Sequence, residues 1–375
     1  MNILIAIIVL IVLYICLNKI YRKYWNRGLN VELSFDTSVL TEDETGHITE
    51  IISNDNFLPI PSLWIKFGVD RSLIFKDSEN VTMSDKCYKN DIFSILLYQR
   101  ITKKLTFTAS KRGYYNVNRI DVVASDLMLS DSLVTSAPCD TTLIVYPRLT
   151  DYKDIEIPFN RIMGEVISRR RIYADPFEFS RIRPYMQGDN PKDINWKATS
   201  KTGTFQTNIH EYTSGQEITF LFNPDSDRLL RDDDLTEEGI RIIATLSTLF
   251  TAQGINVSFY TNAPDILSGQ PSSAKPGYGK SHCEEIYRTL ARLDLDADRE
   301  EFVPFASKLL ANRVLNKESV IVLVSSAKDA KTCELFDSLH DRNNSSAFWI
   351  LPLRSRDLTD SLPMSDHILH WEVKL

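Results

Sequence analysis

The chain has 375 residues, which is too long for one ordinary domain and predicts at least two. Hydrophobic residues make up 43% and charged residues 25%, a composition typical of a folded protein. The formal net charge of −7 argues against a general nucleic-acid binder, because such binding draws its affinity from excess Lys and Arg. The five cysteines form no C-x-x-C pair, which fits a reducing compartment and gives no zinc signature.

The chain begins with an apolar segment. Ile3–Leu17 carries no charge, and we expect residues 1–27 to form a transmembrane anchor followed by a basic juxtamembrane segment. The run is shorter than the roughly 20 residues that cross a bilayer, but Tyr21 and Trp25 can sit at the interface. Because Lys and Arg follow the run, we predict a single-pass protein of the cell membrane with its soluble part in the cytoplasm. A cleaved signal peptide is the alternative, and it lacks the required positive n-region.

Residues 28–148 contain short β-rich runs. Alternating stretches such as 47–53, 62–69 and 119–125 are separated in part by turn residues, including Gly113. Strands at this spacing, without long helical segments between them, predict a β-sandwich.

Residues 149–215 are expected to form a connector with an unusual segment at its centre, Arg181–Lys201. Asn190 can cap a helix and Pro191 suits a first helical position, so a helix start is predicted there. The basic run at residues 169–171 is interpreted as a solvated face. The residues singled out as a partner-binding or interdomain signature are Arg181, Arg183, Tyr185, Gly188, Asp189, Lys192, Ile194, Trp196, Lys197 and Glu211.

The spacing Arg-x-Tyr-x-x-Gly-Asp-x-x-basic-x-Ile-x-Trp-basic resembles the signature of the bacterial "domain of unknown function 58" family. Arg183 and Tyr185 open the match, and Trp196 and Lys197 close it. The resemblance extends over most of the chain. It implies a membrane-anchored protein whose C-terminal part is similar to a von Willebrand factor A domain.

The signature allows two interpretations. In the first it is an internal clamp, in which Arg183 pairs with Asp189 while Tyr185 and Trp196 pack, locking the β domain to the following domain. In the second it is a partner-binding surface, since Trp, Tyr and Arg dominate interface energetics.

Residues 216–375 alternate strands with helices. A buried strand at 217–223 is followed by a helix over 236–253, with Thr236 able to cap it and Gly254 able to end it. A capping box of Ser281 and Glu284 predicts another helix start. The predicted fold class is therefore multi-domain, α/β plus all-β. It comprises an N-terminal transmembrane helix, a β-sandwich, and a von Willebrand A-like, mostly parallel sheet with helices on both faces.

The loop after Asn223 is a candidate metal site. In the von Willebrand A domains that this part resembles, Asp-x-Ser-x-Ser holds a divalent cation, and here the three positions are Asn223, Asp225 and Asp227. All three offer oxygen ligands for Mg or Ca, but none matches the pattern, so the site looks degenerate. The alternative is an acidic loop that favours a helix N-terminus.

Enzyme motifs are missing from the sequence. It has no G-x-x-x-x-G-K-[ST] loop, no G-x-S-x-G elbow and no H-E-x-x-H. We therefore expect a non-catalytic adaptor or scaffold without a cofactor. The family resemblance implies a protein partner, a MoxR-type AAA ATPase, in envelope-associated assembly. The alternatives are a metal-dependent hydrolase or adhesion-type binding domain using the loop after Asn223, and an envelope structural protein that faces outward.

Overall fold

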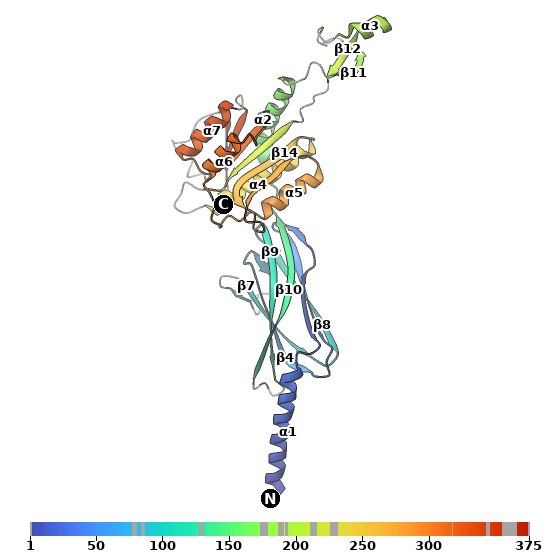
Figure 1. Cartoon of the computed structure of the whole chain (residues 1–375), viewed down its shortest axis with the longest axis vertical. Coiled ribbons are helices and arrows are strands. Elements are labelled where there is room, and N and C mark those ends of the chain that lie inside the picture. The colour runs from blue at the N-terminus through green and yellow to red at the C-terminus, as the bar shows by residue number, and fades with distance from the viewer. Residues whose placement is uncertain are drawn as a thin grey trace. The chain divides into compact units, whose positions relative to one another are not determined.

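The chain divides into two compact units, Met1–Arg148 and Leu149–Leu375, each of which is described by itself (Figure 1). The structure is a computed structural model. It describes residues 2–76, 81–83, 87–126, 129, 131–172, 179–186, 191, 194–210, 216–225, 232–316, 318–342, 346–354 and 366–373.

The first unit consists of a helix followed by strands. The elements are α1 (Asn2–Tyr24), β1 (Leu29–Phe35), β2 (Val39–Thr41), β3 (Thr45–Asn54), β4 (Ile60–Val69), β5 (Leu73–Phe75), β6 (Val81–Met83), β7 (Cys87–Ile95), β8 (Gln99–Ala109), β9 (Gly113–Ser125) and β10 (Ser132–Tyr146). The strands form a four-stranded sheet in the order β1-β3-β8-β5 and a six-stranded sheet in the order β2-β10-β9-β4-β7-β6.

The two sheets share one apolar core. Along β3 every second residue is buried, so that Ile48 and Ile52 face the core while His47 is exposed. β4 and β9 contribute in the same way from the other sheet, and residues of both sheets form one buried cluster. Gly46 allows close packing, because a Cβ there would lie 2.5 Å from Leu40 Cδ1. The predicted β-sandwich is confirmed.

The N-terminal helix requires a correction. Among the residues that the structure describes, no helix is long and apolar enough to cross a membrane. The predicted transmembrane helix is therefore wrong, and with it the predicted fold class. The physical reason lies in the sequence: the charge-free run stops at Leu17, below the roughly 20 residues required. The end of α1 instead joins the sandwich, where Tyr21 is 1% and Trp25 5% exposed.

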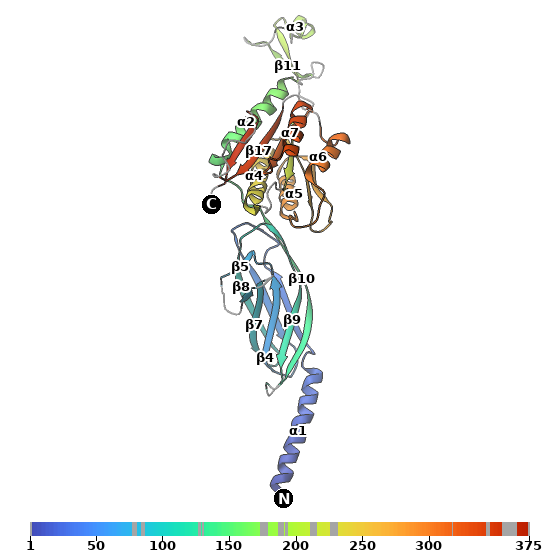
Figure 2. The ribbon, with the colours of Figure 1, turned by 90° about the vertical axis from the view of Figure 1, so that its left-hand side faces the viewer.

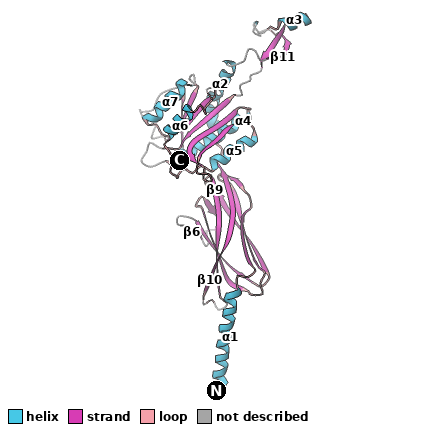
Figure 3. Ribbon diagram, in the orientation of Figure 1, coloured by secondary structure: helices cyan, strands magenta, loops and turns pink. Residues whose placement is uncertain are grey.

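The second unit is built around another sheet. Its elements are α2 (Tyr152–Ile172), β11 (Phe179–Pro184), α3 (Trp196–Thr202), β12 (Gln206–His210), β13 (Glu217–Asn223), α4 (Asp233–Ala252), β14 (Asn256–Pro264), β15 (Pro271–Gly277), α5 (Lys280–Ala291), α6 (Phe302–Ala311), β16 (Val320–Ser325), α7 (Ala330–Arg342), β17 (Ala347–Leu353) and β18 (Ile368–Glu372). The strand order is β15-β14-β13-β16-β17-β18. β11 pairs separately with β12, and Figure 3 marks β11 beside α3.

The large sheet is mixed. Its pairs from β14 through β18 are parallel, but the edge strand β15 runs antiparallel to β14. β13, β16 and β17 are almost continuously buried, as expected for central strands covered on both faces. Phe220 and Phe222 face a cluster formed with α2, α4 and α5, whereas Leu221 faces one formed with α6 and α7. Figure 2 shows these helices around the sheet.

Part of the expected connector belongs to this core. α2 spans 21 residues, and Ile155, Ile162 and Val166 are buried in the same cluster as β13 and α4. Arg169, interpreted as a solvated residue, is 6% exposed and donates from Nε to Ser346 Oγ at 2.6 Å. The second half of α2 is therefore fixed to the sheet by a buried polar contact as well as by apolar packing.

Two predicted helix starts are displaced. α4 begins at Asp233 with Asp232 in the cap position, and Thr236 lies inside it, donating to the Asp232 carbonyl at 3.3 Å. α5 begins at Lys280 after Gly279, whose φ of 85° is in the region that glycine favours. Ser281 is therefore already helical and does not cap.

Candidate functional site

The described signature residues lie on a small hairpin and a short helix. β11 and β12 pair antiparallel, with Arg183 opposite Thr207, and Arg181 lies on the same strand β11. Ile194 forms a bridge with Thr207, and Trp196 and Lys197 start α3. Gly188, Asp189, Lys192 and Glu211 lie outside the described residues, as does Asn190. The structure therefore gives no account of the proposed pair between Arg183 and Asp189.

The described helix of the signature is α3, which starts at Trp196, whereas the start predicted at Asn190 falls largely outside the described residues. Asn195 is its N-cap, and its side-chain oxygen accepts a hydrogen bond from the Ala198 N–H at 2.9 Å. Gly203 ends the helix with a φ of 71°, and its N–H bonds to the Thr199 carbonyl. Trp196 is the first residue of α3, and no residue of this helix is buried.

An exposed aromatic cluster results. The Trp196 and Tyr185 rings both meet Phe205 edge to face, with centroids 6.2 and 6.4 Å from the Phe205 centroid. Trp196 is 66% exposed, Phe205 56%, and neighbouring Met186 62%. Sequence reasoning missed Phe205. Its signal is an aromatic residue directly before β12, two positions after the glycine that ends α3.

Charged side chains lie on the same two elements as this cluster. Lys197 and Lys201 are exposed on α3, and Arg183 is half-buried on β11, donating from Nη1 to the Pro184 carbonyl at 3.0 Å. Exposed rings bordered by cations form a surface of the type that binds proteins. We refer to Tyr185, Met186, Trp196 and Phe205 as the aromatic patch.

The candidate metal loop lies at the carboxyl end of the central strand. Asn223 ends β13 and is 3% exposed, and its amide donates to Ser325 Oγ at 3.0 Å, at the end of the adjacent β16. The same side chain accepts from the Asp225 N–H at 2.9 Å. Asn223, Asp225 and Ser325 are therefore brought together at this edge of the sheet. Asp227 lies outside the described residues.

The Asp225 carboxylate already has a cationic partner. Arg299 Nε lies 3.1 Å from Oδ1, while Oδ2 accepts from Asn262 Nδ2 at 3.1 Å and from the Phe302 N–H at 2.8 Å. Phe302 is the first residue of α6, so the carboxylate also satisfies a helix N-terminus. Sequence reasoning missed Arg299 and Asn262, because both are distant from Asp225 in the chain.

This geometry is that of a structural ion pair. Arg299 further donates from Nη1 to the Leu295 carbonyl at 2.7 Å, which fixes the guanidinium. Over the ranges that the structure describes, no group of three or more His, Cys, Asp or Glu side chains is placed to hold a metal ion. A divalent cation at Asp225 would have to displace Arg299.

A second ion pair lies at the N-terminus of α4. Arg354 binds Asp232 through Nε at 3.1 Å and Nη2 at 2.9 Å, and its Nη2 also contacts Asp234 at 2.7 Å. These contacts fix the helix start to the segment after β17. They agree with the alternative interpretation of this region, an acidic segment that favours a helix N-terminus.

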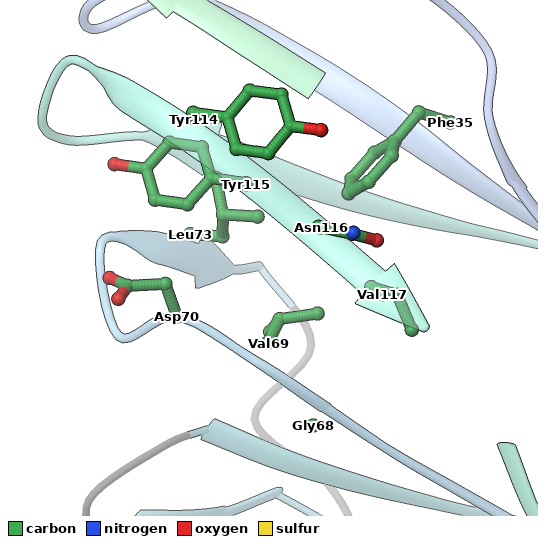
Figure 4. Close-up of a pocket in the computed structure, with 9 residues that line it drawn as sticks. All are labelled: Phe35, Gly68, Val69, Asp70, Leu73, Tyr114, Tyr115, Asn116 and Val117. Atoms are coloured by element: carbon green, nitrogen blue, oxygen red, sulfur yellow. The ribbon is translucent and has the colours of Figure 1, made fainter. Parts of the chain in front are cut away.

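A cavity of about 130 Å³ lies in the first unit (Figure 4). Tyr114 and Tyr115 line it from β9, and Phe35 lines it from β1. Two of its polar groups have partners within the chain: Tyr115 Oη donates to the Lys111 carbonyl at 2.8 Å, and Asp70 accepts from the Ser72 N–H at 2.8 Å. The volume is well below the roughly 300 Å³ at which small-molecule sites begin, so the cavity is not our candidate site.

Comparison with known proteins does not identify a family. No family model matches the chain, and no curated protein matches it. Solved structures with a similar region include the CARDB domain of a Pyrococcus furiosus protein in complex with di-metal ions. That match has 12% identity and a TM-score of 0.22, and covers 32% of this chain and 90% of that one.

Two further structures are similar at the same level. A non-cellulosomal cohesin from Archaeoglobus fulgidus has 11% identity and a TM-score of 0.23, over 31% of this chain and 91% of that one. The C-terminal domain of wzt has 9% identity and a TM-score of 0.24, over 33% of this chain and 77% of that one. At these scores the likenesses carry no conclusion about this chain.

Proposed function

We propose that the protein is a non-catalytic adaptor or scaffold that binds a protein partner through the aromatic patch. The observation that carries the proposal is the exposure of the rings. The ring centroids of Trp196 and Phe205 lie 6.2 Å apart, and both side chains are still more than half exposed. Exposing large apolar side chains to water costs free energy, and burying them against a partner is the main source of hot-spot binding energy.

The clamp interpretation receives less support. Within the second unit the Trp196 side chain is 66% exposed, and the Arg183–Asp189 pair on which a clamp would rest falls partly outside the described residues. Lys197 and Lys201 add exposed positive charge to α3, the helix that carries Trp196. The preferred partner surface therefore combines an apolar groove with carboxylates at its rim.

The identity of the partner is inferred from the sequence resemblance. It indicates a MoxR-type AAA ATPase acting in envelope-associated assembly. Association with the cell membrane, with the soluble part in the cytoplasm, belongs to the same proposal. It draws support from the exposed apolar side chains of α1, such as Leu10 at 64%, and from the cations Arg22 and Lys23 that follow them.

The test compares binding of the MoxR-type ATPase from the same cells to the full chain and to Trp196→Ala/Phe205→Ala. Tyr278→Ala is the matched control, because Tyr278 is 67% exposed but belongs to another part of the second unit. We expect cross-linked pull-down to recover the ATPase with wild type and control, and at least tenfold less with the double variant. Equal recovery with the double variant would show that the aromatic patch does not bind the ATPase. Failure of the wild type to recover the ATPase would refute the partner assignment.

A further inference from the structure

Four charged side chains lie between the two sheets of the β-sandwich. Glu50 on β3 and Lys103 on β8 are direct cross-strand partners in the four-stranded sheet. Lys89 and Asp91 are on β7 of the other sheet. Glu50, Lys89 and Asp91 are each 1% exposed, and the Lys103 side chain is 35% exposed.

All four side chains occupy core-facing positions. Glu50 alternates with the buried Ile48 and Ile52 along β3, and Asp91 lies on the same face of β7 as the buried Ile95. Charges in an apolar core are strongly unfavourable unless they are paired or lose their charge. The cluster is therefore expected either to pair closely or to react.

The geometry places an amine against a carboxyl group. Lys103 Nζ lies 2.9 Å from Asp91 Oδ1, and Lys89 Nζ lies 3.8 Å from the same oxygen. Burial, followed by the negative charge of Asp91, raises the pKa of Glu50 to about 8. Glu50 thus holds a proton at neutral pH near the Asp91 carboxyl, and the carboxyl oxygens of both residues are buried without a hydrogen-bond partner.

We propose that Lys103 and Asp91 condense into an intramolecular amide that covalently joins the two sheets of the sandwich, with Glu50 as the acid that assists the step. An amine 2.9 Å from a buried carboxyl oxygen, with a protonated acid on the facing sheet, provides the groups that such a condensation requires.

The reaction balances without an outside reagent. A proton first passes from the Lys103 ammonium to the Asp91 carboxylate, which makes both groups neutral. The Nζ lone pair then attacks Asp91 Cγ, forming the C–N bond. Glu50 donates its proton to the departing hydroxyl, the Cγ–O bond breaks, and one water leaves. Glu50 regains its proton from the nitrogen.

Lys89 supports this step electrostatically. Its ammonium and that of Lys103 both lie within 4 Å of the same Asp91 oxygen. The same charge stabilises the negative oxygen that develops on Asp91 during the attack. The positive charge that remains in the core thus has a role in the reaction.

The link would join consecutive strands. β7 ends at Ile95 and β8 begins at Gln99 in the other sheet, so an amide between Asp91 and Lys103 closes a short covalent loop around the corner of the sandwich. Closing that loop removes conformations from the unfolded chain, as a disulfide does. An amide does so without an oxidising compartment.

Intact mass spectrometry of the purified full chain tests the proposal. We expect the wild type to weigh less than its sequence by one water. Peptide mapping should recover a branched peptide that joins the Asp91 and Lys103 segments. A wild-type chain of full sequence mass, after prolonged incubation at neutral pH, overturns the proposal whatever the variants do.

The variants locate the reaction. Lys103→Arg keeps the charge but cannot form the amide, and should restore the full mass, as should Glu50→Gln. Lys104→Arg is the matched control: Lys104 is the next residue, solvent-facing and paired with Asp36 at 3.0 Å, and this variant should still lack one water. A water loss that persists in Lys103→Arg, or that maps to a cyclised Asp elsewhere, contradicts the assignment.

Discussion

Replacing Asp225 with Ala should destabilise the second unit. The change removes the acceptor of the Arg299 guanidinium and of the first N–H of α6, at 3.1 and 2.8 Å. Losing the charged hydrogen bond costs about 2 kcal/mol and losing the helix cap about 1 kcal/mol. We therefore expect a loss of about 3 kcal/mol in the free energy of unfolding. Asp225→Asn keeps an acceptor and should lose about half as much.

Hydrogen exchange during urea denaturation is the appropriate assay, because it reports the second unit separately from the first. Amides of β13 and α6 should lose protection in Asp225→Ala. Asp337→Ala, at an exposed position of α7, should change stability by less than about 0.5 kcal/mol. A loss below about 1 kcal/mol in Asp225→Ala would refute the ion-pair reasoning. So would a rise in wild-type stability with Mg²⁺ or Ca²⁺ that disappears in this variant.

Three other predictions concern stability. Because Glu50 holds its proton up to about pH 8 when folded but ionises near its ordinary 4.5 when unfolded, stability should fall as pH rises between these values, by about 1.4 kcal/mol per unit. The test compares Lys103→Arg, which cannot form the amide, with the double variant Lys103→Arg/Glu50→Gln in urea titrations at several pH values. Only the single variant should show that slope, and equal slopes in both would contradict the prediction. Gly239→Ala should lower the melting temperature, because its Cβ would lie 3.2 Å from Phe222 and Val324, whereas Gly164→Ala, with open space around it, should raise the melting temperature. Tyr21→Phe should cost about 1 kcal/mol in thermal unfolding, since its hydroxyl donates to the Pro59 and Ser125 carbonyls at 3.2 and 3.4 Å; an unchanged melting temperature would show these bonds to be inert.

The strands of the sandwich could be predicted because their burial alternates. The run 47–53 reads as a half-buried strand, and β3 spans Thr45–Asn54. The same alternation indicates a buried charged residue, since it places Glu50 on the core-facing side of the strand with Ile48 and Ile52. Its partners could not be found in this way, because Asp91 lies on a strand of the opposite sheet.

The helices that were missed lack a clear sequence signal. α2 is rich in charge and contains Pro158, so it reads as a connector, although its apolar residues enter the core. The capping positions depended on tertiary context: Asp232, and not Thr236, is the N-cap of α4. Arg299 was not predictable as the partner of Asp225, because a contact between residues 74 positions apart depends on the path of the chain around β14.

The way α1 ends has a mechanical consequence. Tyr21 and Trp25 are buried in the sandwich, and the Asn56 amide donates to the Tyr24 carbonyl at 2.8 Å, so the last turn is held by both packing and hydrogen bonding. The helix and the sandwich therefore share no free hinge. A binding partner that fixes the orientation of the helix therefore also fixes the orientation of the sandwich, and a rotation of either part rotates the other. Inserting a flexible Gly-Ser segment after Trp25 would remove that transmission while leaving both parts intact.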